Sequence, residues 1–238
     1  MDESVTYDVY LEIGQDGRCT ARILDLPGCF ASGASEEHAL VALNAIIPRY
    51  YSWLKQHDEY TPDVRGPWRL APRETFRTFM SGNYEVGAFF TPDAVPVDDE
   101  ELDWGLALLG WAYEDLLAMI RALPSALLDA APASGGWTVR QTAEHVAGAQ
   151  LWYLTRLDAQ PKRPAFSQPG TDPATQLQHA SATAISALRA ASDEQRTAVL
   201  EHHGERWSMH KVVRQSVQHI LDHTGQIQRT VSASGFAR

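Results

Sequence analysis

The chain has 238 residues, of which 44% are hydrophobic, and its formal net charge is −10. This length fits one large or two small domains with a packed core. The negative charge argues against a broad nucleic-acid surface, because phosphate binding uses clustered Lys and Arg side chains. No stretch approaches the roughly 18 consecutive apolar residues of a membrane span, and the start Met1–Ser4 is acidic where a signal peptide would be basic. We therefore expect a cytoplasmic protein that binds a small molecule or another protein, without nucleic acid or membrane.

The N-terminal part of the chain has the alternating pattern and turn residues of short strands. Strands are predicted at Tyr7–Ile13, Cys19–Leu24, Cys29–Ser32, Glu74–Phe79 and Tyr84–Phe90. Between the third and fourth, a helix is predicted from its cap Ser35 toward Leu54, because apolar residues recur at helical spacing. Cys19 and Cys29 form no CxxC motif and are expected to be reduced thiols. These elements predict a small α+β domain.

The remainder of the chain has a helical pattern. Residues Thr91–Asp99, with two prolines and several acids, form a predicted linker, which gives domains at 1–92 and 98–238. Helices are predicted at about Asp99–Leu123, Thr138–Ala159, Thr171–Ser192 and Ser208–Ser232, with a proline-rich loop at Pro161–Pro173. Four amphipathic helices at this spacing predict an all-α four-helix bundle, a fold whose core commonly holds metal sites.

Three histidines of this helical region form a candidate metal site. His219 and His223 are four residues apart and share one face of the last predicted helix, while His145 lies on the second. Three imidazole nitrogens would leave open positions for water or substrate, as in catalytic metal sites. The spacing alone leaves a second interpretation open, in which these are hydrogen-bonded or half-exposed histidines without a metal.

Several neighbours of the histidines are candidates for a role in the site. Gln141 and Gln226, each about one turn from a histidine, are candidates to orient an imidazole or a substrate. Glu144 should point away into solvent, so no catalytic residue is assigned beyond the metal ligands. Three arginines are candidates to bind an anionic substrate, and the sequence pattern does not distinguish among them: Arg140, Arg156 and Arg229.

Other histidines are expected to lie outside the site. His202 and His203 fall in a predicted polar loop before the last helix, and His210 lies about 180° around that helix from His219.

Two segments of the helical region together resemble a known family. The run Trp137–His145 (Trp-Thr-Val-Arg-Gln-Thr-Ala-Glu-His), a following Trp152-Tyr153, and the run His219–Ile227 (His-Ile-Leu-Asp-His-Thr-Gly-Gln-Ile) are similar to the two signature segments of the DinB/YfiT-like superfamily. The resemblance covers about Asp99 to Arg238. It implies a four-helix bundle that binds a divalent metal, most often zinc or nickel, through His145, His219 and His223.

The same resemblance suggests a reaction class. Relatives in this superfamily include transferases and isomerases that use bacillithiol or mycothiol, and proteins classed as metal hydrolases. It therefore implies activation of a bound thiol or water by the three-histidine metal site. Since both cysteines precede the bundle, a thiol reaction would need an external low-molecular-weight thiol.

The N-terminal part resembles a different family. The segments Tyr10–Ile13, Asp16–Ala21, Asp25–Cys29 (Asp-Leu-Pro-Gly-Cys) and Ser35–Leu40 are similar to the HicB antitoxin fold, and the match spans about Tyr7 to Leu54. This resemblance implies a β-β-β-α-β unit that contacts a protein partner or a second copy of the chain.

Three hypotheses follow from these observations. The first is a metal-dependent thiol S-transferase, with a metal-dependent hydrolase at the same site as its alternative. The second is an antitoxin-like regulatory protein whose bundle is a scaffold. The third is a metal- or ligand-binding protein without turnover. We expect a small-molecule substrate and a homodimer, and the N-terminal domain is a candidate to bind a protein partner.

Overall fold

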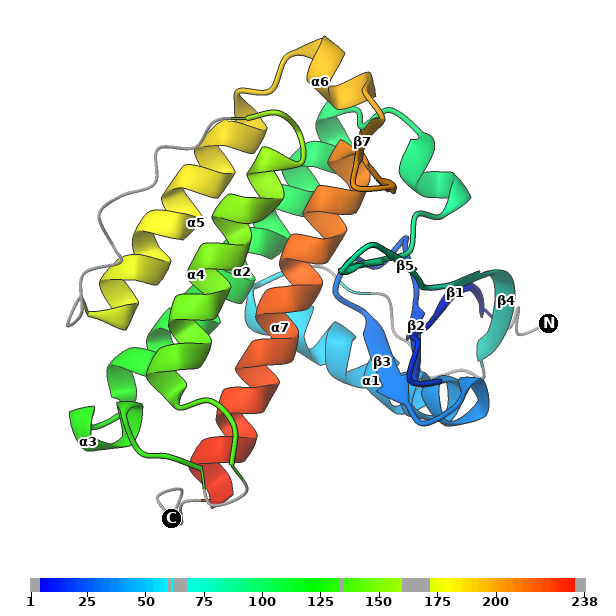
Figure 1. Cartoon of the computed structure of the whole chain (residues 1–238). Coiled ribbons are helices and arrows are strands. Elements are labelled where there is room, and N and C mark those ends of the chain that lie inside the picture. The colour runs from blue at the N-terminus through cyan, green and yellow to red at the C-terminus, as the bar shows by residue number, and fades with distance from the viewer. Residues whose placement is uncertain (1–4, 60, 62–67, 133–134, 160–171, 234–238) are drawn as a thin grey trace. The chain divides into compact units, whose positions relative to one another are not determined.

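The structure is a computed structural model that describes residues 5–59, 61, 68–132, 135–159 and 172–233 (Figure 1). Contacts within it form two compact units. The first comprises residues 1–95 and 199–214, and the second comprises residues 96–198 and 215–238. The division differs from the predicted domains 1–92 and 98–238, because a segment just before and within the last helix belongs to the first unit.

The first unit contains the expected β-β-β-α-β arrangement. Its elements are β1 (Val5–Ile13), β2 (Cys19–Arg22), β3 (Phe30–Gly33), α1 (Glu36–Gln56) and β4 (Trp68–Arg77). The strands form one sheet in the order β3-β2-β1-β4, in which β1 pairs antiparallel with β2 and parallel with β4. The predicted α+β fold class of this region is confirmed.

Alternation along β1 explains why the sheet has two different faces. Val9 and Leu11 are fully buried, as are Leu43 and Ile47 of α1. Glu12 on the opposite face of β1 accepts a hydrogen bond from the backbone N–H of Ala88 at 2.8 Å. One face of the sheet is therefore apolar, and the other carries a charged side chain.

The predicted second hairpin is present but shorter than expected. Residues from Glu74 to Arg77 belong to β4, while the hairpin consists of β5 (Phe79–Ser81) and β6 (Tyr84–Val86). Its turn includes Gly82, whose φ of 62° favours glycine. The pairing of β4 with β1 joins residues about sixty positions apart, which a local pattern does not reveal.

Before the last helix, the predicted polar loop at His202 and His203 is a further hairpin. Strands β7 (Leu200–His202) and β8 (Glu205–Trp207) pair antiparallel. The turn residues His203 and Gly204 both have positive φ, at 56° and 82°, as a type I′ hairpin turn requires. The predicted loop was therefore wrong. The left-handed conformation that closes this turn is uncommon for a histidine, so the sequence gives no signal for it.

Buried ion pairs explain why residues 199–214 belong to the first unit. The guanidinium of Arg214 donates from Nε and Nη2 to the two carboxylate oxygens of Asp93, each at 2.6 Å. Lys211 is fully buried and pairs with Glu205, and Arg22 pairs with Glu12. We call these six side chains the ion-pair cluster.

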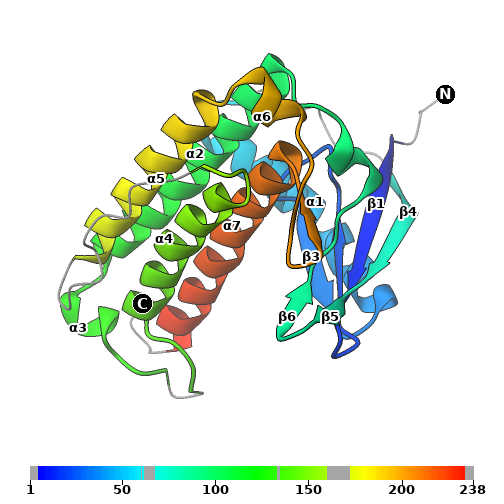
Figure 2. The same ribbon diagram turned by 45° about the horizontal axis from the view of Figure 1, so that its top comes forward.

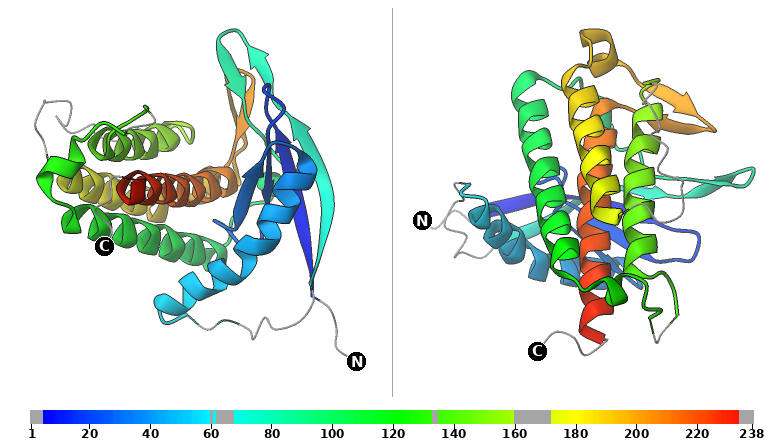
Figure 3. Two further views of the ribbon diagram at one scale, coloured as in Figure 1. Left: turned by 90° about the horizontal axis from the view of Figure 1, so that it is seen from below. Right: turned by 90° about the vertical axis from the view of Figure 1, so that its left-hand side faces the viewer.

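The second unit is helical. Its elements are α2 (Asp99–Ala122), α3 (Ser125–Leu128), α4 (Val139–Thr155), α5 (Pro173–Arg189), α6 (Asp193–Thr197) and the larger part of α7 (Met209–Ala233). Figures 2 and 3 show α2, α4, α5 and α7 side by side as a four-helix bundle, which confirms the predicted fold class. No described helix combines the length and apolar character of a membrane span.

The bundle helices begin at polar caps. Asp98, Thr138 and Asp172 each accept a hydrogen bond from a backbone N–H of the following first turn. Helices α4 and α5 end earlier than predicted, at Thr155 and Arg189. The predicted loop Pro161–Pro173 lies almost wholly outside the described residues.

Candidate metal centre

Three histidine side chains of the bundle converge on one point. His145 projects from α4, while His219 and His223 lie one turn apart on α7. The Nε2 atom of His219 is 3.0 Å from Nε2 of His145 and 3.2 Å from Nε2 of His223. Among the described residues, these three form the group of side chains placed to hold a metal ion. We call them the histidine cluster.

Hydrogen bonding alone does not account for this arrangement. A ring nitrogen offers either one N–H or one lone pair, so Nε2 of His219 cannot form a good hydrogen bond with both neighbours. Two nitrogens bound to one zinc ion at about 2.0–2.1 Å with tetrahedral angles would lie about 3.4 Å apart. The observed separations are close to this value, so the three nitrogens fit a shared cation.

Burial favours the neutral form of His145 and His219. Burial, together with repulsion from the neighbouring His223 and His145, lowers the pKa of His219 to about 3. Burial also lowers the pKa of His145, with a further contribution from His223. The lone pairs are thus available for a metal at neutral pH, since a protonated ring could not bind one.

Gln226 fixes the tautomer of His223. The Nδ1 atom of His223 lies 2.7 Å from Oε1 of Gln226, which can only accept, so Nδ1 carries the proton and Nε2 carries the lone pair. This contact places Gln226 in the orienting position that its spacing predicted. By contrast, Nδ1 of His219 is buried and has no hydrogen-bond partner among the described residues.

Gln141 has a different role from the one expected. Its Oε1 accepts from the backbone N–H of Thr138 at 2.9 Å, while Thr138 Oγ1 accepts from the N–H of Gln141. This reciprocal pair is a capping box at the start of α4. The side chain of Gln141 is therefore engaged at the helix end rather than with a histidine, and the Thr-x-x-Gln pattern was the signal for it.

Aromatic rings surround the histidine cluster. The ring centroid of Trp137 lies 4.6 Å from that of His145, and Trp137 stacks on His223 at 6.3 Å. Tyr153 contacts His219 edge to face at 5.9 Å. Trp137 was noted in the sequence only as part of a family segment, because a tryptophan preceding a helix gives no sign of which side chains it will cover.

The remaining candidate residues lie outside the histidine cluster. Glu144 is exposed, as predicted. Arg140 pairs with Asp129, and Arg156 lies over the ring of Trp152. His210 is not part of the histidine cluster.

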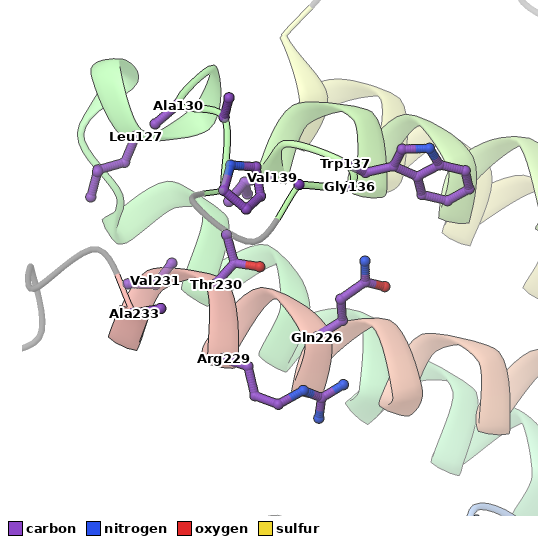
Figure 4. Close-up of a pocket in the computed structure, with 13 residues that line it drawn as sticks. Leu127, Ala130, Gly136, Trp137, Val139, Gln226, Arg229, Thr230, Val231 and Ala233 are labelled. Atoms are coloured by element: carbon purple, nitrogen blue, oxygen red, sulfur yellow. The ribbon is translucent and has the colours of Figure 1, made fainter.

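A cavity of about 610 Å³ lies beside the cluster, between α7 and the segment that leads from α3 into α4 (Figure 4). Trp137 and Gln226, which contact the histidines, also line this cavity. Leu127, Val139, Arg229 and Thr230 contribute to the remaining wall. The candidate metal centre therefore adjoins a space large enough for a small molecule.

Comparison with known proteins places the bundle in a family. A family model described as the DinB superfamily matches residues 108–227, which is half of the chain and includes all three histidines. The chain belongs to the DinB superfamily. This assignment confirms the resemblance that the two signature segments predicted.

A solved structure of similar form comes from a bacterium. It is YfiT from Bacillus subtilis, described as a probable metal-dependent hydrolase with an unusual four-helix bundle topology. Its sequence is 22% identical, the alignment covers 59% of this DinB-superfamily chain and 91% of YfiT, and the TM-score is 0.48.

The N-terminal region matches a separate group of proteins. UPF0150 protein Ta0767 from Thermoplasma acidophilum is 34% identical over 56 residues, which are 24% of this chain and 81% of that protein. This similarity confirms the predicted HicB-like domain. The DinB-superfamily bundle of this chain is thus combined with a UPF0150-type α+β unit.

Proposed function

We propose that this DinB-superfamily protein binds one divalent metal ion, zinc or nickel, through His145, His219 and His223, and that it activates a low-molecular-weight thiol for transfer to an electrophile. The observation that carries the proposal is the convergence of three Nε2 atoms, with separations of 3.0 and 3.2 Å about His219.

The protein's own residues prepare the site. Burial holds His145 and His219 neutral, and Gln226 directs the proton of His223 to Nδ1. A divalent ion held by His145, His219 and His223 would supply a positive charge that lowers the pKa of a bound thiol or water. Trp137 packs against the rings of His145 and His223.

A thiol substrate would have to come from outside the chain. Cys19 and Cys29 are both buried in the first unit, and burial raises the pKa of Cys29 to about 12. Neither is therefore a ready nucleophile. The pKa of a free thiol is about 8.5, far below that of water, so a smaller shift makes a thiol reactive at neutral pH. This difference favours a thiol over water as the activated group.

Metal content tests the binding step. Purified protein should contain about one divalent ion per chain by elemental analysis, and His145→Ala, His219→Ala and His223→Ala should each lose it while circular dichroism shows a folded protein. His179→Ala is the matched control, since His179 lies on α5 of the same bundle and is exposed. Retention of the ion in all three cluster variants, or no uptake of zinc or nickel by wild type, would overturn the proposal.

Activity tests the second step. Metal-loaded protein should consume an electrophile only when bacillithiol, mycothiol or glutathione is added, and His219→Ala should not. Cleavage of an ester or amide substrate without any thiol would replace S-transfer with hydrolysis at the same site.

A further inference from the structure

We propose that the cavity beside the histidine cluster binds a small ligand with an apolar body and a carboxylate, and that Arg229 holds the carboxylate. The inference deepens the proposed function, on which its link to catalysis rests, by naming the substrate class. The carboxylate could belong to the thiol or to the electrophile, and both present the same chemistry to Arg229.

The walls of the cavity suit an apolar group. Leu127, Val139 and Val231 line it together with several alanines and glycines. Its volume of about 610 Å³ lies within the range of small-molecule sites, which are usually apolar with a few fixed polar groups. A hydrocarbon or aromatic body would therefore bury its surface here, within reach of the metal centre.

The polar groups at the cavity favour a negative ligand. Oε1 of Gln226 is occupied by the N–H of His223, so the amide nitrogen is the part of Gln226 left to bind a ligand, and it can only donate. Arg229 is the ionised side chain among the described lining residues, and none of them is acidic. In a chain with a net charge of −10, this local excess of donors and positive charge favours an anion.

The structure distinguishes Arg229 from Arg140 and Arg156. Arg140 is committed to Asp129 through Nε and Nη2, at 2.6 and 3.1 Å. Arg156 lies over Trp152 and donates to Thr155. Arg229 lines the cavity and has no ion-pair partner among the described residues. Its guanidinium can therefore offer a bidentate contact to a carboxylate.

Gly225 allows the position of Arg229. A Cβ atom on Gly225 would lie 3.3 Å from Nη1 of Arg229, so the guanidinium folds back along α7 over the glycine. In Figure 4 the Arg229 side chain runs back along α7, whereas the Gln226 and Thr230 side chains point toward the segment across the cavity. Arg229 and Gln226 both line the cavity, and Gln226 contacts the metal ligand His223, so one small ligand in the cavity could reach both Arg229 and the metal centre.

Calorimetric titration with charged and neutral forms of one ligand tests the proposal. The probes are unreactive stand-ins for the two substrates. 4-Phenylbutyrate and its amide replace the electrophile, and S-methylglutathione and its diamide replace the thiol. For at least one pair, wild type should bind the carboxylate about 10- to 100-fold more tightly than the amide, as expected for a charge-assisted contact. Arg229→Gln should abolish this preference, and Arg229→Lys should retain part of it.

Two controls keep this result separate from the proposed function. Arg140→Gln should leave the preference unchanged, and Arg229→Gln should keep its metal and its fold. In metal-depleted wild type the preference should persist, because Arg229 is not a metal ligand. A preference that survives in Arg229→Gln but disappears with the metal, or no preference in either pair, would overturn the inference even if the metal site is real.

Discussion

The ion-pair cluster of the first unit and the histidine cluster of the second are both polar groups in protected surroundings, but their charges are balanced differently. In the ion-pair cluster, three cations face three anions: Arg22, Lys211 and Arg214 against Glu12, Glu205 and Asp93. In the histidine cluster, three ring nitrogens face one another, and among the described residues the group includes no carboxylate. The ion-pair cluster pairs its charges internally and so stabilises the fold. The histidine cluster, whose lone pairs converge, needs a bound cation to pair with them.

The largest expected effect is the loss of stability when the ion-pair cluster is disrupted. Asp93→Ala leaves Arg214 buried without its bidentate partner and should lower the free energy of unfolding by about 3–5 kcal/mol. Urea denaturation measures this change. The matched control is Asp99→Ala, which removes the exposed partner of Arg196 and should change stability little.

Metal content should distinguish the two clusters in the same experiment. Asp93→Ala should keep its metal, since Asp93 belongs to the first unit. Loss of the ion from this variant while it remains folded would show that the clusters are not independent.

A smaller effect should follow from removing the metal. If free metal is present at about 100 times its Kd, a chelator should lower the free energy of unfolding of wild type by about 2.7 kcal/mol. Thermal denaturation with and without chelator measures this loss. His179→Ala should respond like wild type and His219→Ala should not respond; an equal chelator response in both variants would contradict the assignment of the histidine cluster.

The smallest effect concerns the two glutamines. Gln226→Leu removes the acceptor that orients His223 and should weaken metal binding by about 10- to 100-fold. Gln141→Leu should leave metal affinity unchanged and weaken the start of α4 instead. Competition with a chromophoric chelator measures both, and equal affinities in the two variants would remove the orienting role of Gln226.

The sequence predicted the centre of the site better than its surroundings. His219 and His223 share a helix face by spacing and His145 lies on another predicted helix, so the sequence named all three that the structure brings together. The partner of each glutamine depended on side-chain direction, which spacing does not give. The arginines were likewise equivalent in the sequence, and only the contacts of Arg140 and Arg156 separated them from Arg229.

Long-range pairing limited the fold prediction. The positions of the main helices and of the strands β1 to β3 follow from local patterns, whereas β4 depends on its parallel partner β1. The ion-pair cluster joins residues that are more than 100 positions apart, such as Asp93 and Arg214. Such pairs look like ordinary surface charges in the sequence. A homodimer and a protein partner for the HicB-like unit remain predictions.

Helix α7 runs without a break from Met209 to Ala233, yet its residues up to Arg214 belong to one unit and its later residues to the other. The gene for this protein therefore cannot be divided by a single cut into two self-contained parts. A fragment that begins after Val95 would carry Arg214 without Asp93, and one that ends there would lack Glu205 and Lys211. Recombination that exchanges the HicB-like unit for another must replace two separate stretches of sequence, or else inherit both units together.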